Sequence, residues 1–100
     1  MNNYFDFSNR AIRTLKVKLN DRLTVLVTAP TLKLLNELSN FDVKDTNPNQ
    51  IMKLALKIFN NNKGSRRVDL KDIENISTDD LVEFIKEYTE FIGSVTKDPN

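Results

Sequence analysis

The chain has 100 residues, of which 39% are hydrophobic and 29% are charged, and its formal net charge is +1. These totals are typical of one globular domain, and the near-neutral charge argues against a dedicated DNA-binding protein. The sequence has no cysteine, which excludes disulfides and zinc–thiolate sites, and no histidine, the commonest general base and metal ligand. We therefore expect a single domain over residues 1–100 that is not an enzyme and needs no metal or cofactor.

The N-terminal residues lack the basic and apolar regions of a signal peptide. No apolar run in the chain reaches the roughly 18 residues that a membrane-spanning helix needs. We therefore expect a cytoplasmic protein with no membrane segment. Residues 1–10 show no period and are predicted to form a flexible arm. Its aromatic residues, Tyr4, Phe5 and Phe7, either pack back onto the core or dock on a partner.

Residues 12–29 are predicted to form a β-hairpin, because apolar and polar residues alternate on both sides of residues 20–22. A three-residue loop lets opposite residues share a face. It pairs Leu15 with Val27, Val17 with Val25, and Leu19 with Leu23. Arginine stands where such a loop often has glycine, so a longer or bulged turn is an alternative. Because an isolated hairpin is only marginally stable, this one must pack on helices or pair its edge with another chain.

Two helices are predicted next. Thr31 can cap a helix that runs to about Ser39, with Leu32, Leu35 and Leu38 on one stripe. A polar loop follows. Asn47 can then cap a second helix, with Pro48 at its first position, that continues to about Asn60. This second helix carries two apolar stripes, one of Ile51, Leu54, Ala55 and Ile58, and one of Met52, Leu56 and Phe59. A helix this apolar is central to a core or to an interface.

The segment NNNKGSRR, residues 60–67, combines a polar run with a glycine and three cations. It follows a helix, so Gly64 suits the left-handed conformation near a helix end, and the cations suit the helix dipole. A phosphate-binding loop needs the reverse order, with a helix beginning after the glycines. We therefore interpret the segment as a solvated connection, and contact of Lys63, Arg66 and Arg67 with nucleic acid is the less favoured alternative.

Two further elements complete the chain. Residues 68–76 are predicted to form a short helix or turn in which Leu70 and Ile73 face inward. Ser77 or Thr78 then caps a long final helix. Its apolar residues repeat at helical spacing: Leu81, Phe84, Ile85, Tyr88, Phe91, Ile92 and Val95. The chain is therefore predicted to be α+β, with an N-terminal hairpin followed by three to four helices.

The order of these segments resembles the tail assembly chaperones of long-tailed phages and prophages of low-GC Gram-positive bacteria. The resemblance covers about residues 12–100 and is strongest in APTLKLLNEL (29–38) and YTEFIGSVTKDPN (88–100). It implies a chaperone, encoded next to the tape measure gene, that binds the tape measure protein and helps tail tube subunits assemble around it. The implied partners are these two proteins, with a second copy of the chain as an alternative.

A chaperone for a helical, apolar client needs exposed hydrophobic grooves. Methionine and aromatic residues suit such adaptable surfaces. The candidate partner-binding residues are therefore Met52, Leu56, Phe59, Phe84, Tyr88 and Phe91. Two other functions stay open: a structural head–tail or tail accessory protein of a phage, and a small nucleic-acid-binding regulator.

Overall fold

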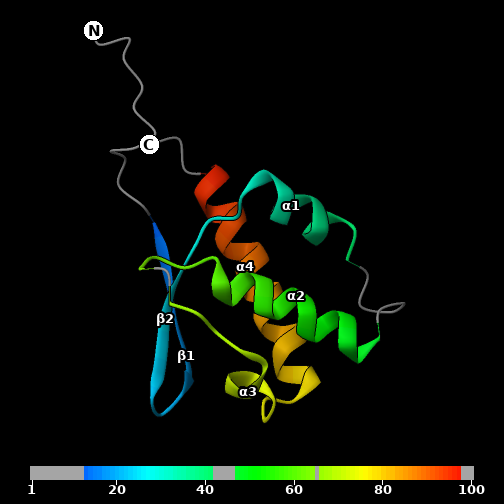
Figure 1. Ribbon diagram of the computed structural model, residues 1–100. Helices are drawn as coiled ribbons and strands as arrows, with labels where there is room; N and C mark the ends of the chain where they lie inside the picture. The colour runs from blue at the N-terminus through cyan, green and yellow to red at the C-terminus, as the bar shows by residue number, and fades with distance from the viewer. Residues whose placement is uncertain (1–12, 42–46, 65, 98–100) are drawn as a thin grey trace, which may run out of the picture.

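The computed structural model describes residues 13–41, 47–64 and 66–97, and the side chains of 94–97 are not among them. The elements run in the order β1 (Thr14–Asn20), β2 (Leu23–Thr28), α1 (Leu32–Ser39), α2 (Pro48–Asn60), α3 (Leu70–Ile73) and α4 (Thr78–Lys97) (Figure 1). This is the predicted α+β fold, in which a hairpin precedes the helices. The predicted N-terminal arm, residues 1–10, lies outside the described residues.

The hairpin register agrees with the prediction over most of its length. Leu15 pairs with Val27 and Val17 pairs with Val25. The predicted pairing of Leu19 with Leu23 is wrong, because Asn20 is the residue opposite Leu23 and the register shifts between Lys18 and Asn20. This irregularity leaves a two-residue turn and takes up Leu19 as the extra residue of a bulge. The Asn20 side chain accepts a hydrogen bond of 2.8 Å from the Arg22 amide and so stabilises the turn.

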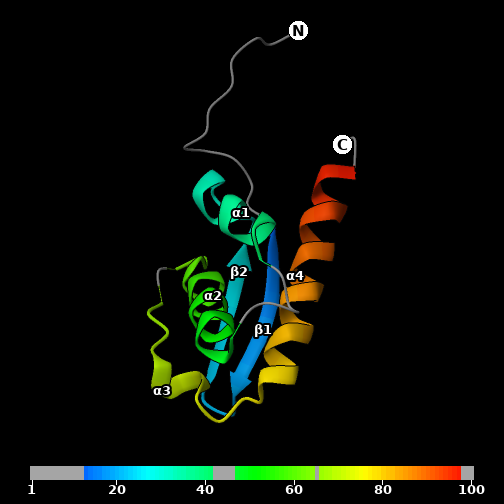
Figure 2. The same cartoon turned by 90° about the vertical axis from the view of Figure 1, so that its right-hand side faces the viewer.

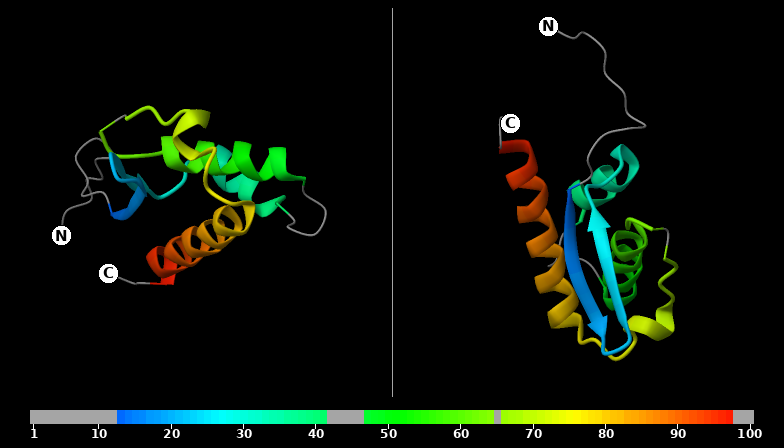
Figure 3. Two further views of the ribbon diagram at one scale, coloured as in Figure 1. Left: turned by 90° about the horizontal axis from the view of Figure 1, so that it is seen from below. Right: turned by 90° about the vertical axis from the view of Figure 1, so that its left-hand side faces the viewer.

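Two layers form the molecule. In Figure 2, α2 and α4 lie over the same face of the hairpin, with α2 beside β2 and α4 beside β1. The right panel of Figure 3 shows the opposite face of the hairpin, which no described element covers. The alternation of the strands matches this arrangement, since Leu23, Val25 and Val27 are buried while the residues between them are exposed. One sheet face therefore belongs to the core and the other faces solvent.

The core lies between the hairpin and the two longer helices. From α2 it takes the whole first predicted stripe and Phe59, and from α4 it takes Leu81, Ile85 and Tyr88. Two smaller contributions come from Val68 and from Ile73 of α3. The prediction that Leu70 also faces inward is wrong, because this side chain is about half exposed and the buried residue before Ile73 is Val68.

Side-chain caps begin the helices where the sequence indicates. The Thr31 hydroxyl accepts a hydrogen bond of 3.3 Å from the Leu34 amide at the start of α1. The Asn47 side chain accepts one of 3.0 Å from the Gln50 amide, with Pro48 at the first helical position of α2. The Ser77 hydroxyl accepts one of 3.1 Å from the Asp80 amide in the first turn of α4. Each cap satisfies an amide that has no partner within its own helix.

Thr28, at the end of β2, joins three elements. Its amide donates a hydrogen bond of 2.9 Å to the carbonyl of Asn61, which follows α2. Its own carbonyl accepts hydrogen bonds from the Asn61 side chain at 3.1 Å and from the Tyr88 hydroxyl of α4 at 2.7 Å. Tyr88 is fully buried, and this bond satisfies the polar end of its ring.

Burial raises the pKa of Tyr88 above its ordinary value of 10.0, and the hydrogen bond with Asn61 opposes part of that rise. The unfolded chain therefore releases this proton near pH 10, whereas the folded chain releases it only at higher pH. The stability that this shift contributes is complete below about pH 10 and is lost as the pH rises through the folded value.

We expect Tyr88→Phe to lower the free energy of unfolding by about 1 kcal/mol at neutral pH, because one buried hydrogen bond is lost. The cost stays small because the Thr28 carbonyl keeps its bond from Asn61. Above pH 10 the wild-type protein should lose stability more steeply than the variant. Urea unfolding from pH 7 to pH 11 measures both effects, and parallel curves above pH 10 would show that Tyr88 is not the group responsible.

Candidate protein-binding surface

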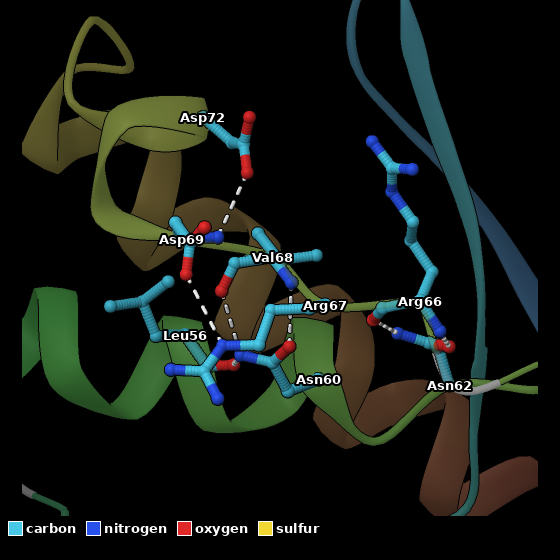
Figure 4. Close-up of polar contacts among 8 residues, drawn as sticks. All are labelled: Leu56, Asn60, Asn62, Arg66, Arg67, Val68, Asp69 and Asp72. Atoms are coloured by element: carbon cyan, nitrogen blue, oxygen red, sulfur yellow. Dashed lines mark hydrogen bonds and ion pairs between the residues drawn. The ribbon is translucent and has the colours of Figure 1, made fainter.

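The asparagine side chains of NNNKGSRR hold backbone groups in place, and Figure 4 shows two of them, Asn60 and Asn62. The Asn60 side chain accepts a hydrogen bond of 2.7 Å from the Val68 amide and donates one of 3.0 Å to the Val68 carbonyl. It also donates one of 3.0 Å to the Leu56 carbonyl, within the last turn of α2. Because Val68 is buried, Asn60 satisfies backbone groups that would otherwise lack partners.

Asn62 closes the loop in a similar way. Its side chain accepts a hydrogen bond of 2.9 Å from the Arg66 amide and donates one of 2.7 Å to the Arg66 carbonyl. Between these two residues, Gly64 has a φ of 97°, the left-handed conformation that the sequence analysis assigned to it. Sequence reasoning treated the asparagines as a polar connection and missed their structural role. The run of three amide side chains directly after a helix is the signal that could have revealed it.

The cations of this loop do not form a phosphate-binding site. Lys63, Arg66 and Arg67 are exposed, and the Arg67 guanidinium lies 3.2 Å from the Asp69 carboxylate. Asp69 is the N-cap residue of α3, and its amide donates a hydrogen bond to the Asp72 carboxylate. The loop amides of Arg66 and Val68 are engaged by asparagines, so neither is available to bind an anion. A nearby carboxylate also offsets the charge of Arg67.

Four of the six candidate partner-binding residues form one aromatic row. The ring centroids of Phe59 and Phe84 are 4.7 Å apart, those of Phe84 and Tyr88 6.2 Å, and those of Tyr88 and Phe91 6.0 Å. Phe59 and Tyr88 are 1% and 0% exposed, so they belong to the core and present no surface to a partner in this conformation. Phe84 and Phe91 are half-buried, and the Arg13 guanidinium lies 5.8 Å from the centre of the Phe91 ring.

The other two candidates lie on α2, apart from the aromatic row. Met52 and Leu56 are half-buried, one helical turn from each other. Leu56 lines a groove between α1 and α2 whose rim carries Lys33, Glu37 and Lys57. An ion pair between Lys57 and Glu37 crosses this groove. The groove is therefore bridged by polar side chains, and the structure does not bring the six predicted residues together on one open surface.

The clearest exposed apolar surface lies on α1, which sequence reasoning did not select. Leu34 points into the core, whereas Leu32 is 74% exposed and Leu35 is 40% exposed. These two leucines lie on one stripe with Leu38, which is half-buried in the last turn of α1. The predicted stripe of Leu32, Leu35 and Leu38 therefore runs from solvent toward the core.

A groove between α1 and α4 continues this apolar surface. It has a volume of about 300 Å³ and is lined by Leu38, Phe41, Val82, Ile85, Lys86 and Thr89. Leu38 therefore belongs both to the leucine stripe of α1 and to the wall of the groove. We call Leu32, Leu35 and this groove the α1 surface. Its apolar side chains and its helical walls suit the apolar face of a helix from another protein.

The described residues offer little other chemistry. Within residues 13–41, 47–64 and 66–97, no three acidic side chains converge as a metal site would require. No helix in this described part of the chain is long and apolar enough to span a membrane. The α1 surface is thus the strongest candidate for a functional site.

Comparison of the chain with protein-family models, with curated proteins and with solved structures found no match. Function must therefore be inferred from the residues of the chain itself.

Asn60→Ala should lower the free energy of unfolding by about 2 kcal/mol, because it leaves the backbone amide and carbonyl of buried Val68 without partners. Asn49→Ala, at an exposed position of α2, is the matched control and should change stability by less than about 0.5 kcal/mol. Urea unfolding measures both. Equal stability of the two variants would show that Asn60 does not hold the loop.

Phe59→Ala should lower the free energy of unfolding by about 3–5 kcal/mol, since it removes a large buried ring. Met52→Ala should cost clearly less, because the Met52 side chain is only half-buried. Thermal unfolding of both variants tests this difference. If the Phe59 variant is as stable as the wild-type protein, Phe59 is not a core residue and is again a candidate for partner binding.

Proposed function

We propose that this chain is a tail assembly chaperone of a long-tailed phage or prophage. In this role it binds the tape measure protein, and tail tube subunits with it, in the cytoplasm of the bacterial host, and it catalyses no reaction. The observation that carries the proposal is the exposure of Leu32 and Leu35. Both leucines lie within residues 29–38, where the sequence resembles these chaperones most strongly.

The physical support comes from the position of these leucines on a stable element. α1 is anchored to the core by Leu34 and capped by Thr31, so its exposed face does not need to form on binding. A preformed surface loses less conformational entropy when a partner binds. The tape measure protein is long, helical and prone to aggregation in the family that the chain resembles. Covering apolar positions of such a helix is what the α1 surface would do.

A structural role in the phage particle is the main rival, because the same surface would also serve a permanent interface. The two roles differ in the fate of the protein. A chaperone leaves once the tail is complete, whereas a connector or accessory protein stays. Mass spectrometry of purified phage particles distinguishes the two roles. Finding this protein in the particles at stoichiometric levels would overturn the chaperone proposal.

The direct test is co-expression with the tape measure protein, a large coiled-coil protein that the proposal predicts to be encoded downstream. The wild-type chain should increase the soluble fraction of that protein and co-purify with it. Leu32→Asp/Leu35→Asp should abolish both effects, because the two charges occupy the proposed contact. The variant should stay folded, with its free energy of unfolding within about 0.5 kcal/mol of the wild type, since both positions are exposed.

Lys33→Glu is the matched control for this experiment. It lies on the same helix, is exposed, and changes the net charge by the same amount as the two aspartates together. It should retain solubilisation and co-purification. Loss of binding in the control as well would assign the effect to net charge. Unchanged binding in the leucine variant would show that the α1 surface is not the contact.

A further inference from the structure

The outer edge of β1 carries backbone groups that no described residue engages. The amide of Lys63 donates to the carbonyl of Leu26, and the amide of Thr28 donates to the carbonyl of Asn61, so these groups of β2 point away from β1. Backbone groups of successive strand residues point to alternate sides. Val25 and Val27 therefore bond to Val17 and Leu15 of β1.

It follows that the amides and carbonyls of Thr14, Lys16 and Lys18 point away from β2, to the outer edge of β1. The residues that follow α2 line the other edge of the hairpin, where Asn62 forms a bridge with Val27. Within the described residues, the sheet has these two strands only, so the outer edge of β1 is its open edge. An open edge of this kind is where a further strand can pair.

An apolar groove runs beside this open edge. It lies between β1 and the first turns of α4, and has a volume of about 300 Å³. Its apolar lining residues are Val17, Leu19, Phe59, Ile76, Leu81 and Phe84, and the charged residues Lys18 and Asp80 also line it. A strand added to β1 would direct every second side chain toward this groove, because directly opposite residues in a sheet share a face.

The other face of the edge is positively charged. Lys16 and Lys18 are exposed and alternate with the half-buried Leu15 and Val17, so they belong to the face of β1 opposite the core. In the described strands, the charged side chains on this face are these two lysines. Lys18 lies 3.7 Å from the Asp21 carboxylate, but both side chains are largely exposed, so this pair is weak. Carboxylates on an added strand would lie directly opposite the lysines.

We propose that β1 accepts an extended segment of a partner protein as a third strand, and that this segment alternates acidic with apolar residues. The acidic residues face Lys16 and Lys18, and the apolar residues enter the groove beside Phe84. The backbone bonds supply affinity, and the alternating side chains supply specificity. This inference does not depend on the identity of the partner as a tape measure protein.

A second copy of the chain fits this edge poorly. Antiparallel pairing of two β1 strands would set the lysines of one copy against those of the other, and like charges directly opposite each other are destabilising. Lysines on an edge strand commonly oppose such self-pairing. The same charges favour an acidic strand, so the occupant is a partner of opposite charge.

The test uses the full-length protein and a synthetic peptide, long enough to span β1, in which glutamates alternate with valine and phenylalanine. Binding is measured by fluorescence anisotropy of the labelled peptide. Hydrogen exchange of the protein amides is followed by NMR. On saturation, exchange at Lys16 and Lys18 should slow by at least about tenfold, because their amides become hydrogen-bonded. Exchange at Val17, already bonded within the hairpin, should change little.

Two pairs of variants separate backbone pairing from charge. Lys16→Pro removes an amide that the hairpin does not use, and Lys16→Ala removes the same charge but keeps the amide. The proline variant should bind the peptide at least about tenfold more weakly than the alanine variant. Lys16→Glu/Lys18→Glu should also weaken binding at least about tenfold relative to Lys53→Glu/Lys63→Glu, a control at exposed positions with the same net charge.

Several results would overturn the proposal. These are no peptide binding by the wild-type protein, equal binding within either pair of variants, or slow exchange at Lys16 and Lys18 in the free protein. A concentration-dependent dimer that protects the same amides would assign the edge to a second copy instead. If Lys16→Pro fails to fold, the exchange data and the glutamate variants still decide between support and rejection.

Discussion

The hydrogen bonds at Thr28 hold the two layers of this protein together. The amide and carbonyl of this one residue connect the end of β2 to Asn61 after α2 and to Tyr88 on α4. The hairpin alone is too small to be stable, so it depends on the helices that cover its apolar face. Apolar packing supplies most of that stabilisation but is not directional. The bonds at Thr28 fix where each helix lies along the sheet.

This constraint also explains why the most polar segment of the chain is structural. The chain leaves α2 through its last residue, Asn60, and the following Asn61 and Asn62. These asparagines connect the helix to β2 and to the loop before α3 without leaving buried backbone groups unpaired. Asparagine can donate and accept with one short side chain, which suits this task. The amides of Arg66 and Val68 are therefore engaged and cannot bind a phosphate. The cations beside them remain on the surface, where the Asp69 carboxylate offsets part of the charge of Arg67.

Local patterns predicted much of the fold, because their physical causes are local. The caps at Thr31 and Asn47 depend on one side chain and one amide three residues away, and both are present. Face sharing predicted the Leu15–Val27 register, and the arginine in place of glycine left a bulged turn as an alternative, but the sequence did not show that the bulge falls at Leu19. The six candidate site residues were harder to place. The sequence pattern of an aromatic stripe is the same whether the stripe lies in a core or on a surface. Only the packing of α4 on α2 shows that Phe59 and Tyr88 are buried.

The two surfaces that remain open suit partners of different conformation. The α1 surface presents exposed leucines beside a groove between helices, which suits an amphipathic helix, whereas the edge of β1 presents backbone groups, which suit an extended chain. Both surfaces border α4, since its residues line each groove. A client that is partly helical and partly unfolded would engage both. Once one segment of a client binds its surface, the effective concentration of the other segment near the second surface rises. Two weak contacts on one rigid body can then bind together more tightly than either does alone. A chain of this size could therefore hold such a client without one large interface.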